Sequence, residues 1–186
     1  DHNCLGHGNF EADTAATGLA LLAFLGAGHS HRSGEYQNQV GRGIQWLVHS
    51  QKTNGDLFTD KSQFLWLYSH GMAAIALCEA YGMTKDPAFK APAQRSLDFI
   101  VAAQHPGFGA WRYRPQFESD TSVSGWQLMA LKSGQMAGLS VPQSAYKGVS
   151  KWLDSVETKS SPGRFSYHPS KPNSQAMTAE GLLMRQ

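Results

Sequence analysis

Two acidic residues near the middle of the chain stand directly before an uncharged segment, where a carboxyl group could act as an acid toward an apolar substrate. They are Glu118 and Asp120, and the segment 121–131 that follows carries no charge. In apolar surroundings the pKa of a carboxyl group rises, so that it can donate a proton near neutral pH. Glu118 and Asp120 are therefore the candidate catalytic residues.

Asp120 also has a structural explanation, which we favour. Aspartate before a helix is a preferred N-cap that contributes about 1 kcal/mol, and its charge suits the helix dipole. The segment "FEADTAATG" (10–18) repeats the pattern of "FESDTSVSG" (117–125), with Asp13 at the position of Asp120. A residue that recurs in two copies of a repeat is typical of a structural role, so both aspartates are predicted to cap helices.

Aromatic residues gather around the apolar segments, where they could line a cavity for an apolar ligand or stabilise a cation through their ring faces. They are Trp66, Tyr68, Trp111, Tyr113 and Trp126. Packing between helices is the favoured explanation for most of them. The candidate ligand-binding residues are Asp13, Trp66, Tyr68, His70, Trp111 and Trp126.

The sequence predicts no metal site and no cofactor. On a helix, the spacing of eight residues from His70 to Cys78 separates them by about 12 Å, which is too far for one metal ion. Zinc-capable residue types also gather at the N-terminus, at Asp1, His2, Cys4 and His7. A terminal segment without a metal is the favoured interpretation of this group. The two cysteines, Cys4 and Cys78, allow one disulfide at most.

Composition excludes several classes of protein. A chain of 186 residues is one domain by length and long enough to bury a core. The net charge of +2 does not indicate a nucleic-acid partner. The longest apolar stretch, roughly residues 15–28, is too short to span a bilayer.

Four small, apolar segments recur along the chain and determine the predicted architecture. They cover residues 14–28, 69–82, 121–134 and 178–186, and they align on Gly18, Gly71, Gly125 and Gly181 with steps of 53, 54 and 56 residues. A helix that is apolar on nearly all sides is buried on more than one face. We therefore expect four inner helices that begin near Asp13, Ser69, Asp120 and Ala176.

Segments of a second kind alternate with the first. Residues 41–51, 94–104 and 146–156 place apolar residues on one stripe, as Val40, Ile44, Leu47 and Val48 do in the first of them. Glycine and proline mark loops at 29–35, 85–92, 105–115 and 160–174. Buried helices that alternate with one-sided helices predict an all-α fold in two layers, which curve toward a solenoid or a ring.

The chain is predicted to be a single repeat domain over residues 1–186 and a piece of a longer protein. Residues 6–10 look like the tail of a preceding repeat, and residues 179–186 stop inside an inner helix. The remaining repeats, or a second chain, would complete the ring.

The one-sided segments carry a motif made of a basic residue, a small residue, an aromatic–aliphatic pair, Gln, and Gly-x-aromatic. The first copy has Arg42, Gly43, Trp46, Leu47, Gln51 and Gly55, with Leu57 in place of the last aromatic residue. The second has Arg95, Ser96, Phe99, Ile100, Gln104, Gly109 and Trp111, with one inserted residue. The third has Lys147, Gly148, Trp152, Leu153, Gly163 and Phe165, with Glu157 in place of Gln.

This motif resembles the repeats of the squalene–hopene cyclase and protein prenyltransferase superfamily, and the resemblance covers most of the chain. It implies a partial α/α toroid with two concentric layers of helix pairs, repeated about every 54 residues. The motif itself is expected to be structural. Gln can bond unpaired backbone groups at a helix end, glycine permits the turn, and the aromatic ring covers it.

The resemblance also bears on the acidic residues. Terpenoid cyclases that start by protonation carry Asp-x-Asp-Asp-Thr at an inner helix, and the middle Asp donates the proton. Aligning Thr121 and Thr14 with that Thr places Ser119 and Ala12 at the donor position. Neither residue can act as a strong acid.

Two functions remain open on the sequence. The favoured one is a non-catalytic toroid-repeat domain that binds a protein, a peptide or an apolar ligand on its concave face. The alternative is a terpenoid cyclase that protonates a polyprenyl substrate through Glu118 or Asp120, with an acid elsewhere in the ring as a further source of catalysis.

Overall fold

The computed structural model describes residues 11–186, and this part of the chain is helical without β-strands. The helices are α1 (Asp13–Gly26), α2 (Gln37–Ser50), α3 (Trp66–Thr84), α4 (Pro87–Ala103), α5 (Thr121–Met136), α6 (Gln143–Val156) and α7 (Gln175–Arg185), with a short 3-10 helix at Gln63–Leu65. Two isolated bridges, Glu157–Phe165 and Ser166–Asn173, order the loop before α7. The prediction of an all-α fold is confirmed.

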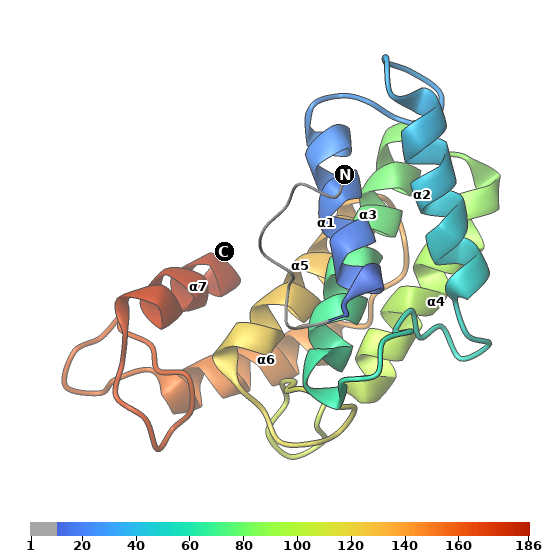
Figure 1. The fold of residues 1–186 in the computed structure, drawn as a ribbon. Coiled ribbons are helices and arrows are strands. Elements are labelled where there is room, and N and C mark those ends of the chain that lie inside the picture. The colour runs from blue at the N-terminus through green and yellow to red at the C-terminus, as the bar shows by residue number, and fades with distance from the viewer. Residues whose placement is uncertain (1–10) are drawn as a thin grey trace, which may run out of the picture.

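The helices alternate between two kinds of position, as the sequence predicted. Helices α1, α3, α5 and α7 contact one another in that order, and α2, α4 and α6 each pack against two successive members of this row. In Figure 1 the row runs from α1 and α3 through α5, and α2 and α7 lie at opposite ends of the molecule. The repeating unit is therefore a pair of helices.

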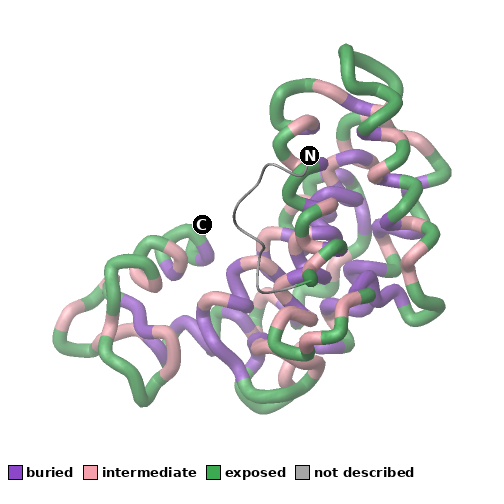
Figure 2. Tube along the Cα trace, viewed as in Figure 1, coloured by how far each residue is buried: buried purple, intermediate pink, exposed green. Residues whose placement is uncertain are grey.

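Burial follows the amphipathic character of each helix. Helix α3 is buried along most of its length, because it is covered by α1, α5, α2 and α4. In α2 only the stripe of Val40, Ile44 and Leu47 is buried. Figure 2 shows the same contrast, with buried residues concentrated on the central helices and exposed residues along α2 and α7.

Glycines set the close approach of successive inner helices. A Cβ atom at Gly18 would lie 2.9 Å from the backbone nitrogen of Ala73, and one at Gly71 would lie 2.6 Å from Nε2 of Gln127. A side chain at Gly18 would require the backbone of α3 to move, and one at Gly71 would displace the side chain of Gln127 on α5. The recurring glycine is thus explained by packing between helices.

The fourth copy is in a different register from the one predicted. Asp120 and Ser174 are both N-caps whose side chains accept a bond from the backbone N–H three residues later. Ser124 and Thr178 both accept a backbone N–H from the Gly-x-aromatic turn before their helix. These equivalences give a step of 54 residues from the third copy to the fourth, the same as from the second to the third, so the alignment on Gly181 was wrong by two residues.

The structure shows that the recurring Gln bonds backbone carbonyl groups at the end of its own helix, as predicted, and also joins α2 to α4 and α4 to α6. Nε2 of Gln104 donates to the carbonyl oxygens of Gly109 at 2.7 Å and Ala145 at 2.9 Å. Gln51 makes the same two kinds of contact in the first copy. Gly109 has a φ of 79°, and a Cβ there would lie 2.5 Å from the carbonyl oxygen of Gly148. Only glycine fits this turn.

Two boundaries differ from the predictions. Helix α3 begins at Trp66 rather than near Ser69, and α4 begins at Pro87 inside the segment 85–92 that was predicted as a loop. Proline is well tolerated in the first turn of a helix, where its missing N–H has no partner in any case. Asp86 caps this helix by accepting the N–H of Ala88 at 3.0 Å. The segment is therefore helical despite its two prolines.

Candidate functional site

One side of the inner helices is not covered by any described helix, and we call it the open face. Its side chains recur at the spacing of one helical stripe on each helix, so they lie in rows across the molecule. Leu19 and Leu183 are 45% and 52% exposed, and the others are half-buried. The apolar members of the open face are Leu19, Leu22, Met72, Trp126, Met129 and Leu183.

A pocket lies on this face where α5 meets α7. It has a volume of about 320 Å³ and is lined mainly by apolar side chains, among them Met129, Met136 and Leu183. Met136 is 86% exposed. The open face is therefore hollowed at its α7 end.

Asp120 is the N-cap of α5, at one end of the open face, and its side chain is fully buried. Its Oδ1 accepts the N–H of Val123 at 2.7 Å, which confirms the predicted N-cap. Its Oδ2 accepts the hydroxyl of Tyr167 at 2.8 Å and lies 3.5 Å from Nε of Arg112. Burial raises the pKa of Asp120, and these contacts only partly oppose the rise.

Glu118, the second candidate acid, has different surroundings. Its carboxylate forms an ion pair with Arg112, and its side chain is 48% exposed. The residue has a φ of 45°, a left-handed conformation that a non-glycine residue adopts only when its surroundings hold it there. Arg112 thus joins the two acidic residues that the sequence singled out.

A chain of hydroxyl groups connects Asp120 to the loop before α5. Because Tyr167 donates to Asp120, the 2.8 Å contact between the two tyrosine hydroxyls has Tyr113 donating to Tyr167. The Tyr113 ring lines a small aromatic pocket of about 220 Å³ together with Phe64 and Phe117. Phe64 is 70% exposed. This aromatic pocket is a second place where an apolar group could bind.

A residue that the sequence analysis missed, Glu180, lies on the open face itself. The step of 54 residues places Glu180 on α7 where α5 has Trp126. Its Oε1 occupies the space that a Cβ at Gly125 would need, and its carboxyl group has no hydrogen bond to another described residue. Burial and the nearby charge of Asp120 raise its pKa to about 7. The 54-residue step relates its position to that of Trp126, but nothing in the sequence marks its carboxyl group as one that packs against another helix.

Tyr68 and Trp126, both predicted to bind a ligand, lie on or beside the open face. The hydroxyl of Tyr68 donates to Ser122 at 2.9 Å across the contact between α3 and α5. Burial raises the pKa of Tyr68, and Asp120 and Glu180 add to the rise. The structure therefore brings Tyr68, Trp126, Asp120 and Glu180 to the same end of the inner helices.

The other predicted ligand-binding residues lie elsewhere. Trp111 is 1% exposed and donates its indole N–H to the carbonyl oxygen of Ile100 at 2.8 Å, as a core residue does. Asp13 is the first residue of α1, and its side chain makes no capping bond, so the predicted cap is wrong at this position. Its backbone N–H instead donates to Oδ1 of Asp60 at 3.0 Å.

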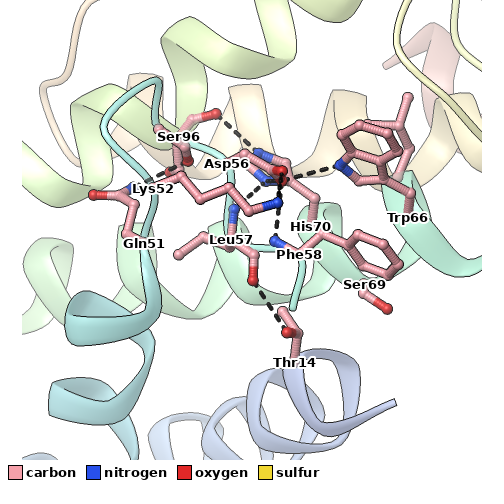
Figure 3. A network of polar contacts seen from close by, with 12 residues as sticks. Thr14, Gln51, Lys52, Asp56, Leu57, Phe58, Trp66, Ser69, His70 and Ser96 are labelled. Atoms are coloured by element: carbon pink, nitrogen blue, oxygen red, sulfur yellow. Dashed lines mark hydrogen bonds and ion pairs between the residues drawn. The ribbon is translucent and has the colours of Figure 1, made fainter. Parts of the chain in front are cut away.

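Trp66 and His70 belong to a buried polar network around Asp56, shown in Figure 3. Asp56 accepts the indole N–H of Trp66 at 3.0 Å and pairs with Lys52 at 2.7 Å. Burial opposes its ionisation, but its ion pair with Lys52 and its bond from the N–H of Phe58 lower the pKa of Asp56.

His70 is itself fully buried and bonded at both ring nitrogens. Nδ1 accepts the N–H of Leu57 at 3.1 Å, and Nε2 lies 3.1 Å from the carbonyl oxygen of Ser96, which it faces as a donor. It therefore holds a neutral tautomer and ties the turn at Leu57 to α4. No ring atom is left for a ligand.

Residues 11–186 contain neither a candidate metal site nor a candidate membrane span. No group of three His, Cys, Asp or Glu side chains in this range could hold a metal ion, and no helix in it is long and apolar enough to cross a membrane. Cys78 is buried with a free thiol, and burial raises its pKa to about 12. Cys4 and the group of Asp1, His2 and His7 lie outside the described residues.

Comparison with known proteins adds no assignment. No family model, no curated protein and no solved structure matches the chain.

Proposed function

We propose that this chain is a non-catalytic repeat domain that binds an apolar ligand on the open face. In this proposal the helix pairs form part of an α/α toroid of the squalene–hopene cyclase and protein prenyltransferase type. The inner helices α1, α3, α5 and α7 form the inner layer, and the open face is its concave side. The observation that carries the proposal is the band of Leu19, Leu22, Met72, Trp126, Met129 and Leu183, which no described helix covers.

The size of this band supports a binding role. Contiguous exposed apolar surface on a soluble domain is typical of an interaction or ligand site. Burying one such side chain completely stabilises a complex by about 1.5–3 kcal/mol, and these side chains are already about half-buried. Six of them offer several kcal/mol in total, from which the costs of association must still be subtracted.

The contacts of the two candidate catalytic acids favour a structural role for them. Asp120 is fixed by its cap bond and by Tyr167, and Glu118 is paired with Arg112 beside solvent. Ser119 and Ala12 occupy the positions where the resemblance would require the proton donor. For these reasons a binding domain is favoured over a terpenoid cyclase.

Glu180 is the one observation that favours the alternative function, because it places a carboxyl group on an apolar face. A group with a pKa of about 7 is, however, a weak acid for the protonation of an isolated alkene. A protein or peptide could also use the open face, and further repeats or a second chain could enclose it. We propose the apolar ligand because each helix contributes only one stripe of side chains to the open face. The face is therefore narrow, and it suits an extended apolar molecule better than a protein surface.

The proposal can be tested with Nile red, a neutral apolar dye, and with dodecanol as its competitor. Met72→Lys places a charge in the middle of the open face and should weaken dye binding by at least about tenfold. Phe64→Lys is the matched control, because it places the same charge in the aromatic pocket of Phe64, Tyr113 and Phe117.

The two variants distinguish the two sites. We expect dodecanol to displace the dye and Phe64→Lys to bind it like the wild type. Loss of binding in Phe64→Lys with full binding in Met72→Lys would place the ligand in the aromatic pocket and refute the proposal. Thermal unfolding of both variants shows whether either has lost its fold.

A further inference from the structure

We propose that Glu180 binds the cationic head of an amphiphilic ligand, so that the open face takes a long-chain ammonium compound. The alkyl chain would lie along the apolar band, and the ammonium group would lie between Glu180 and the ring of Trp126. This inference rests on the proposed function and adds to it the chemical class of the ligand.

The geometry around Glu180 carries the inference. Its Oε1 fills the space beside Gly125 of α5. The Cβ atom of Trp126 lies in the equivalent place beside Gly71 of α3. Glu180 and Trp126 are therefore neighbours in one row of the open face, because the carboxyl group of Glu180 reaches α5 at the residue next to Trp126.

Within residues 11–186, the groups that surround Glu180 make their hydrogen bonds to other residues. Asp120 is satisfied by Val123 and Tyr167, and Tyr68 donates to Ser122. The carboxyl group of Glu180 has no hydrogen bond to any residue in the range 11–186. A half-buried carboxyl group without a partner is costly unless it is protonated or meets a cation.

The charges near the open face favour a cation over an anion. Asp120 and Glu180 bring two carboxyl groups to one end of the open face. Glu79 lies on the stripe of α3 that also carries Met72, and its carboxylate accepts the hydroxyl of Ser133. The nearest described guanidinium groups are already engaged, since Arg112 contacts Glu118 and Asp120 and Arg185 contacts Asp154 and Glu157. An anionic head would be repelled, and a neutral head would leave the charge unpaired.

Aromatic rings add to the selectivity for an ammonium group. A quaternary ammonium ion within about 6 Å of an indole face gains roughly 0.5–2 kcal/mol, and more when water is excluded. Trp126 is half-buried and Tyr68 lies one row away on α3. A carboxylate together with aromatic faces is a combination that recognises quaternary ammonium ligands.

The test compares dodecyltrimethylammonium with dodecanol, both below their aggregation concentrations, by isothermal titration calorimetry on the full chain. The quaternary head keeps its charge at every pH, so any pH dependence comes from the protein. The groups that face Glu180 are Asp120 on α5 and Tyr68 on α3, and Asp120 in turn contacts Arg112 and Tyr167. Glu180→Gln removes the proposed anchor and keeps the size of the side chain.

We expect the ammonium compound to bind wild-type protein at least about tenfold more tightly than dodecanol at pH 8, and the advantage to shrink as the pH falls below about 7. Glu180→Gln should abolish this advantage and its pH dependence, while dodecanol binding stays unchanged. Glu35→Gln, an exposed glutamate outside the open face, serves as the matched control.

The outcomes separate this inference from the proposed function. If dodecanol binds and the ammonium compound has no advantage, or keeps it in Glu180→Gln, the inference is wrong and the binding domain stands. If neither compound binds, both the inference and the proposed function are wrong.

Discussion

The raised pKa of Glu180 predicts a measurable change in how stability depends on pH. In the folded chain this pKa is about 7, against an ordinary value of 4.5 for glutamate, so the folded state holds the proton more tightly than the unfolded state. Between these two values the folded state binds more protons, and stability therefore falls as the pH rises through the window. Glu180→Gln has no proton to lose and should lack this decline.

The magnitude follows from the shift. A difference of about 2.5 pKa units corresponds to about 3.4 kcal/mol as an upper bound. Glu180 is only partly buried, so solvent screening reduces this figure, and we expect about 1 kcal/mol. Relative to its own stability at pH 4.5, wild-type protein at pH 8 should be destabilised by about that much more than Glu180→Gln.

Urea denaturation at several pH values measures the difference. Other groups titrate in the same range, but they are common to both proteins, so the difference between the two curves isolates Glu180. Glu35→Gln changes the same net charge at an exposed position and should follow the wild-type curve. Parallel curves for wild type and Glu180→Gln would refute the placement of this carboxyl group against Gly125 and beside Asp120.

Three further predictions follow from the same contacts. Asp120→Ala should lose roughly 2–3 kcal/mol of unfolding free energy, because both the cap bond and the Tyr167 bond disappear. Asp120→Asn should lose about 1 kcal/mol, because asparagine still caps the helix. Equal losses in urea denaturation would show that the cap contributes little. Gln104→Ala should cost about 2 kcal/mol in the same assay, since it removes the bonds to Gly109 and Ala145, and a cost near zero would deny the motif its structural role. Incubation with squalene or geranylgeranyl diphosphate should give no cyclic product on chromatographic analysis, because no strong acid among residues 11–186 faces the apolar band. A product that disappears in Glu180→Gln would establish the cyclase alternative.

Much of the fold was predictable from the sequence, because its signals are local. Single helices carry these signals: α2 and α6 each have an apolar stripe with a period of 3.6 residues, and α3 is apolar on nearly all sides. These patterns predicted the correct number and kinds of α-helices in the described chain. The Asp120 cap and the roles of Gln104 and Gly109 depend on residues close in sequence or on an exact repeat. The failures were local as well. At Asp13 the helix starts one residue earlier than the cap pattern requires, and at Pro87 a proline that was taken to mark a loop begins a helix.

The candidate site was beyond the sequence, because it is made by contacts between helices. Glu180 is an ordinary charged residue in the sequence, and its raised pKa exists only because α7 packs its carboxyl group against Gly125 and near the buried Asp120. His70 and Trp111 had the residue types of a site, but the neighbouring turns and α4 enclose them completely. Periodicity determines which face of a helix is apolar, whereas desolvation and charge proximity depend on which helix lies opposite. The sequence by itself therefore determined the helix pairs and their repeat, and the tertiary structure alone decided which carboxyl group meets the open face.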